Sequence, residues 1–128
     1  MSTYIRFYTT VFCGRAKRPL GIFRALGVLQ DEERIEDYFS ETVDDTLRWF
    51  NKNLSAPRIA ERDRTCLFWF RADRQQFVAR LWELVAILVE HDVEVRRVKT
   101  HDPGMIVYRD DFQVAAVPSQ RIANALRV

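Results

Sequence analysis

Cysteine is scarce in this sequence, with Cys13 and Cys66 as the two examples among 128 residues. Each lies in or beside a segment rich in apolar residues. Two isolated cysteines in a chain with enough apolar residues for a core are typical of buried thiols, which excludes a disulfide-stapled scaffold. The sequence therefore predicts a reducing compartment, and we expect the cytoplasm.

Histidine is equally scarce: His91 and His101 are the two present, and each precedes an aspartate. Metal-dependent phosphohydrolases use such His-Asp pairs, but they need additional His and Asp ligands, and zinc sites take three or four ligands. We expect His91 at a helix end, where the helix dipole favours it, and His101 in a turn. The sequence therefore predicts no metal and no cofactor.

Long apolar runs are also absent. The longest stretch lies near Leu81 to Val89 and is interrupted by Glu83, whereas a membrane span needs about 20 residues. The first residues do not form a basic segment followed by an apolar one, as a signal peptide would. No Gly-x-Ser-x-Gly, Walker loop or dinucleotide fingerprint occurs. We therefore expect neither a membrane partner nor an enzyme.

The charges that are present are segregated along the chain. Residues 1–30 carry five basic groups and no acid, and residues 31–45 carry eight acids and one base, although the net charge is only +2. Such a distribution predicts a dipolar molecule rather than one uniformly attractive surface.

Hydrophobic periodicity predicts the order β-α-α-β-α-β-β-β-α for residues 1–128. The expected elements are strands at 4–12, 66–70, 93–99, 105–108 and 112–117, and helices at 20–29, 31–54, 74–90 and from Ser119 onward. Strands and helices in this order favour a single α+β domain, with a mostly antiparallel sheet of about five strands covered by helices. Asp110 and Asp111 suit a hairpin turn, and Ser119 suits a helix cap.

Two of these helices have clear apolar stripes. In the 31–54 helix the stripe comprises Ile35, Tyr38, Phe39, Val43, Leu47, Phe50 and Leu54, and its first turn would hold Asp31, Glu32 and Glu33. In the 74–90 helix it comprises Phe77, Leu81, Leu84, Val85 and Leu88, widened by Val78, Trp82, Ala86 and Val89. The wider stripe predicts the more buried helix, with Trp82 in the core like Trp69. Asp73 is expected to cap this helix, with Gln76 as its capping-box partner.

Three basic residues, Arg15, Lys17 and Arg18, follow Cys13 in a loop just before a helix. Basic side chains and helix N–H groups suit a phosphate or an acidic partner. The same charges would lower the pKa of a thiol, but Pro19 stands where cysteine phosphatases need an arginine. The loop is therefore a candidate for anion or partner binding, or for a small enzyme.

A second basic group, Arg96, Arg97 and Lys99, lies on one expected strand. With Tyr4 and Tyr8 as stacking platforms it suits nucleic acid, although the acidic run at 31–45 opposes this interpretation. Trp49 falls beside the main stripe of its helix, and if exposed it would serve as an anchor for a protein partner.

Four stretches carry a resemblance: Trp49-Phe50-Asn51 with Leu54 and Pro57, Phe68-Trp69-Phe70, Trp82-Glu83-Leu84-Val85, and Pro103-Gly104 through Tyr108, Asp110, Gln113 and Pro118. Together they resemble a group of small bacterial proteins with no known activity. The resemblance implies a bacterial or phage origin and one compact fold, and it implies no site residues.

Our leading hypothesis is a non-enzymatic binding or regulatory module that contacts another protein. The alternatives are a phosphate-ligand binder or small enzyme centred on residues 13–18, and a nucleic-acid-binding protein that uses the basic strand and loop. The sequence does not determine the oligomeric state.

Overall fold

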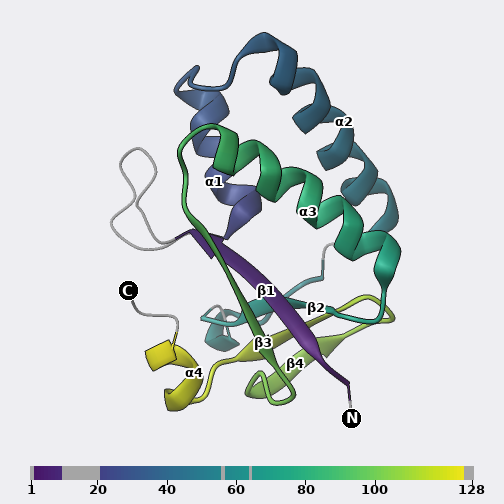
Figure 1. The fold of residues 1–128 in the computed structure, drawn as a ribbon. Helices are drawn as coiled ribbons and strands as arrows, with labels where there is room; N and C mark the ends of the chain where they lie inside the picture. The colour runs from purple at the N-terminus through teal and green to yellow at the C-terminus, as the bar shows by residue number, and fades with distance from the viewer. Residues whose placement is uncertain (1, 10–20, 56, 64, 126–128) are drawn as a thin grey trace. The chain divides into compact units, whose positions relative to one another are not determined.

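A computed structural model describes residues 2–9, 21–55, 57–63 and 65–125. Its elements, in chain order, are β1 (Tyr4–Thr9), α1 (Ile22–Asp31), α2 (Asp37–Asn53), the 3-10 turn η1 (Glu61–Asp63), β2 (Leu67–Arg71), α3 (Gln75–Glu90), β3 (Val95–Thr100), β4 (Met105–Arg109), β5 (Gln113–Val117) and α4 (Gln120–Ala125) (Figure 1).

The predicted α+β class and element order are confirmed. The five strands follow the order β3-β1-β2-β5-β4. β1 pairs antiparallel with β2, β2 with β5, and β5 with β4. The all-apolar segment predicted as a central strand is β2, which lies between β1 and β5.

Backbone contacts divide the chain into two compact units. The first comprises residues 1–6, 56–78 and 98–128, and the second comprises residues 7–55 and 79–97. Three elements, β1, α3 and β3, therefore have residues in both units. The single-domain assignment stays a prediction.

The core of the first unit forms where β1, β2, β5 and α4 contribute alternate side chains. Tyr4, Trp69, Val114 and Ile122 are buried together, and the register pairs Trp69 with Val114. Strand side chains alternate between faces, so this register places the two on one side of the sheet. Ile122 belongs to α4, and its amide donates to the Ser119 hydroxyl oxygen at 3.2 Å, as expected for the predicted helix cap.

The Arg6 side chain links β1 to β2. The two strands pair Tyr4 with Arg71 and Ile5 with Phe70. At the next position the Arg6 side chain donates from Nη1 to the carbonyl oxygen of Phe68 at 2.9 Å. Burial lowers the pKa of Arg6 to about 10, because the charged guanidinium loses water.

The second unit has a helical core. Leu26 and Leu29 of α1, Val43 of α2, and Leu84 and Leu88 of α3 are all fully buried. These residues recur at three- and four-residue steps, as required for one face of a helix. The predicted inner stripe of α3 is therefore confirmed.

The helix predicted at 31–54 is α2, but its predicted start is wrong, because α1 extends to Asp31 and α2 begins at Asp37. Glu33 adopts the left-handed backbone conformation, with φ of 54°. The Glu33 amide donates to Gln30 and the Arg34 amide donates to Leu29, at 3.0 and 2.9 Å. These two bonds form a Schellman motif, which usually carries glycine at the left-handed position.

Two aromatic residues predicted to be buried are exposed. Tyr38 is 80% exposed, because five residues separate it from Val43 and a helix turns about 140° beyond one full turn over that distance. Trp82 is 45% exposed, since it lies on the side of α3 opposite Leu84 and Leu88. The prediction that Trp82 belongs to the core is wrong.

The predicted hairpin turn at Asp110 is confirmed. One carboxylate oxygen of Asp110 accepts from the amides of Phe112 and Gln113 at 2.8 and 2.9 Å, and the other accepts from the Tyr108 hydroxyl at 2.8 Å. Burial opposes the charged form, but these hydrogen bonds outweigh it, so the pKa of Asp110 lies below its ordinary value.

Candidate functional site

The outer side of α3 carries a row of exposed apolar residues within the second unit. We call this row the α3 seam, and it comprises Ala79, Trp82, Ala86 and Val89. Trp82 is 45% exposed and Val89 is 57% exposed. The steps of three, four and three residues place all four side chains on one helix face. The apolar spacing on α3 that predicts a buried stripe therefore corresponds here to an exposed helix face.

Trp82 is held in place although it is exposed. Its ring meets the edge of the Phe7 ring at a centroid distance of 4.9 Å, and Phe7 is itself buried. The Arg97 guanidinium lies over the indole at 5.8 Å, a cation–π arrangement. A tryptophan positioned by neighbours on its own unit loses little conformational freedom when a partner covers it.

Two acidic residues flank the seam on α3. Glu83 and Glu90 are both exposed. The Arg80 guanidinium approaches the Glu83 carboxylate to 3.5 Å, an exposed pair of small energetic value. Glu90 forms no ion pair within the part of the chain that the structure describes. The seam therefore has apolar side chains along its helix face, the Arg97 guanidinium over Trp82, and two carboxylates along one edge.

Trp49, the predicted partner anchor, has a different setting. It is partly buried on α2, where Arg80 of α3 lies 5.0 Å from its ring centroid. The Arg80 side chain therefore makes two contacts, because it approaches the Glu83 carboxylate and also lies over the Trp49 ring. The aromatic residue of the second unit that projects from a continuous apolar surface is Trp82, not Trp49.

The predicted basic residues fall into four settings. Arg15, Lys17 and Arg18, with Cys13, lie outside the described residues. Arg96 is exposed and pairs with Glu94 at 3.4 Å.

Arg97 covers Trp82 in the second unit, and Lys99 belongs to the first unit. The expectation that Tyr4 and Tyr8 stack on bases is wrong, because both are buried. Tyr4 belongs to the core cluster of the first unit.

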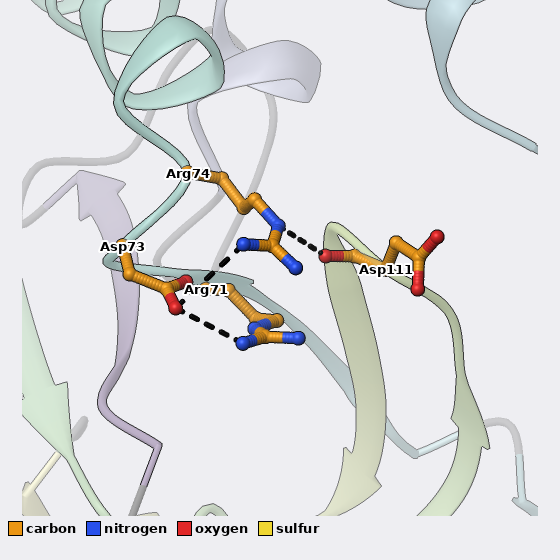
Figure 2. Close-up of polar contacts among 4 residues, drawn as sticks. All are labelled: Arg71, Asp73, Arg74 and Asp111. Atoms are coloured by element: carbon orange, nitrogen blue, oxygen red, sulfur yellow. Dashed lines mark hydrogen bonds and ion pairs between the residues drawn. The ribbon is translucent and has the colours of Figure 1, made fainter.

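The first unit holds a polar cluster where β2 leads into α3 (Figure 2). The Arg71 Nη2 lies 3.0 Å from the Asp73 carboxylate, and Arg74 Nη1 lies 3.7 Å from the same oxygen. Arg74 also donates from Nε to the Asp111 carbonyl oxygen at 2.8 Å. The cluster therefore ties the start of α3 to the β4–β5 turn.

Asp73 consequently serves a different role from the predicted helix cap. α3 begins at Gln75, and the Val78 amide donates to the Arg74 carbonyl oxygen. The hydrogen bond from Arg71 is the main reason why the pKa of Asp73 lies below its ordinary value. An open depression beside Asp73 is lined by Ser2, Thr3, Ala72, Asp73 and Lys99.

Cys66 lies at the start of β2 and is partly buried. Burial, followed by the nearby Asp63 carboxylate, raises the pKa of the Cys66 thiol. A thiol with a raised pKa is a poor nucleophile at neutral pH. These properties favour a structural role for Cys66.

Comparison of the chain with protein-family models, with curated proteins and with solved structures gives no match in any of the three. Among the described residues, no helix is long and apolar enough to cross a membrane. The same part of the chain contains no cluster of three or more His, Cys, Asp or Glu side chains arranged to hold a metal ion.

Proposed function

We propose that this chain is a non-enzymatic protein-binding module and that the α3 seam is its docking surface. The observation that carries the proposal is the exposure of Trp82 in the middle of an exposed apolar row. Tryptophan is the residue most enriched at the energetic centres of protein interfaces, because it removes a large apolar area from water when covered.

The surroundings of Trp82 support this role over a purely structural one. A tryptophan that served only the core would direct its ring inward, as Trp69 does with no exposed area. Trp82 instead rests on Phe7 and beneath Arg97 while nearly half of its surface meets water. Covering that surface would contribute on the order of 25 cal/mol for each Å² of apolar area buried.

A photo-crosslinking experiment tests the proposal. A photo-reactive phenylalanine analogue replaces Ala86 in the seam, or Thr42 on the exposed side of α2 as the control, in the full chain expressed in its native host. We expect an adduct with a protein at position 86 and none at position 42. Substitution W82R in the same chain should abolish the adduct, because a charge then occupies the centre of the seam.

Matched controls separate docking from folding. Y38R changes another exposed aromatic residue of the second unit and should leave the adduct intact. Circular dichroism and urea unfolding establish that W82R still folds, and A86R, read by a photo-reactive residue at Ala79, blocks the seam without touching the Phe7 contact. The proposal fails if position 86 gives no protein adduct, or if the adduct persists in folded W82R and A86R chains.

A further inference from the structure

Three pairs of similar side chains in or beside the α3 seam lie seven positions apart, and this spacing indicates what kind of segment fits the seam. The pairs that are seven positions apart are Ala79 with Ala86, Trp82 with Val89, and Glu83 with Glu90. Seven residues make nearly two helical turns, or about 10 Å. Small, large and acidic side chains therefore each recur along the helix axis at a period that a second helix can match.

The backbone of α3 limits the partner further. The amides and carbonyls within a helix already pair with one another, so the outer face of α3 offers side chains and no backbone hydrogen bonds. An extended peptide would leave its own backbone groups without partners on such a surface. A helix brings its backbone already paired and meets the seam through side chains alone.

The alternation of side-chain size gives a shape to match. Ala79 and Ala86 are small, whereas Trp82 and Val89 are large and exposed. Small residues at every seventh position allow helix axes to approach to about 8 Å. The complementary helix therefore carries large apolar side chains opposite the alanines and a small residue opposite Trp82.

The acidic edge decides between a foreign partner and a second copy of this chain. In an antiparallel pair of identical α3 helices, Glu83 and Glu90 of one copy would face the same residues of the other. In a parallel pair they would face Val78 and Val85 positions, which carry no charge. Like charges brought together oppose the antiparallel self-pair, and the parallel self-pair leaves both carboxylates without a charged partner, so basic side chains of a different protein complement this edge better than a second copy does.

We infer that the α3 seam binds an amphipathic helix of another protein that carries lysine or arginine along the edge facing Glu83 and Glu90. The inference rests on the proposed function and deepens it, because it specifies the partner's secondary structure and charge. Glu90, which has no ion pair among the described residues, and Glu83, whose pairing with Arg80 is exposed, are both available to such a partner.

Two designed peptides test the inference. Each is a side-chain-stapled helix of roughly three heptads, with leucines to meet the two alanines and an alanine to meet Trp82. One peptide carries lysine and the other carries glutamate at the flanking positions. Isothermal titration with the full chain should show the lysine peptide binding about three- to tenfold more tightly, the range expected for two exposed ion pairs.

Charge reversal gives the decisive control. The double substitution E83K/E90K should invert the preference between the two peptides, whereas E41K on α2 should leave it unchanged. Equal affinities for the native chain, or a preference that survives the double reversal, overturn the inference. Sedimentation equilibrium of the chain alone should show a monomer, and a dimer that dissociates in W82R would assign the seam to a second copy instead.

The two proposals fail separately. If the crosslinking experiment gives a protein adduct at position 86 but the lysine peptide has no advantage, the docking surface stands and the inferred partner chemistry is wrong. If neither adduct nor peptide binding is found, both proposals are wrong.

Discussion

Charged side chains form hydrogen bonds to backbone groups in the first unit. The Arg6 guanidinium donates to the Phe68 carbonyl oxygen, and the Asp110 carboxylate accepts from two amides at the β4–β5 turn. A partly buried backbone group without a partner costs free energy. The Arg6 and Asp110 side chains therefore supply hydrogen-bond partners to backbone groups of the first unit.

Removing the Asp110 carboxylate tests this role. We expect D110A to lower the free energy of unfolding by about 1–2 kcal/mol at neutral pH, because the amides of Phe112 and Gln113 lose their acceptor. D111A is the control, because only the backbone carbonyl of Asp111 is used, by Arg74. Urea unfolding of the three proteins measures the difference.

The same comparison should depend on pH. The folded pKa of Asp110 lies below its ordinary value, so its contribution is complete above about pH 4, the pKa of an unperturbed aspartate. It declines as the pH falls further and disappears below the folded pKa. A gap between native protein and D110A that stays constant into strong acid would contradict an electrostatic role.

Two glycines should respond in opposite directions to alanine. Gly104 has φ of 115°, and a Cβ there would overlap the Val117 carbonyl oxygen and lie 3.0 Å from the Pro118 Cα. G104A should therefore cost about 2 kcal/mol or more. Gly27 lies within α1 with no atom within 4 Å of an added Cβ, so G27A should stabilise the protein by about 0.5–1 kcal/mol. Thermal unfolding of the two variants checks both signs.

At the scale of elements, α1 and α3 end in the same way. Each has an acidic residue in the left-handed conformation, Glu33 with φ of 54° and Asp92 with φ of 64°. The Val93 amide donates to Leu88 at 3.0 Å, as Arg34 donates to Leu29. Glycine is the usual residue there because it has no Cβ, so neither helix end could be located from a glycine in the sequence.

Replacing Glu33 by glycine should stabilise the α1 terminus. Removing the Cβ relieves the left-handed strain, and removing the negative charge relieves repulsion by the helix dipole, together about 1 kcal/mol. E33Q separates the contribution of charge from that of conformation. E32G is the control for conformation, since Glu32 has φ of −90° and glycine relieves no left-handed strain there. A loss of stability in E33G, measured by urea unfolding, would contradict this account.

At the scale of the whole molecule, the two compact units share β1, α3 and β3. The candidate surface lies in the second unit, whereas the polar cluster of Figure 2 lies in the first. Apolar periodicity indicates all three of these elements, because a helix or strand with one buried face repeats its apolar residues. The helix predicted at 31–54 begins later, at Asp37, because Glu33 adopts the left-handed conformation with no glycine in the sequence to indicate it.

The site was the least predictable part. Trp82, Ala86 and Val89 were assigned to the core because they extend the apolar stripe of α3, and no property of the sequence separates an apolar residue facing the core from one facing water. Tyr38 was misassigned for the same reason. The spacing places Trp49 beside the main stripe, but the Arg80 side chain that lies over its ring comes from another helix.

The sequence by itself determined the class of fold, the order of the elements and the turn at Asp110, because these depend on periodicity and on short-range hydrogen bonds. The tertiary structure decided which side of α3 stays exposed, because the core of the second unit has room for only one of its two apolar faces. Leu81, Leu84 and Leu88 fill that core. Trp82 is therefore left at the surface, where Phe7 and Arg97 hold it.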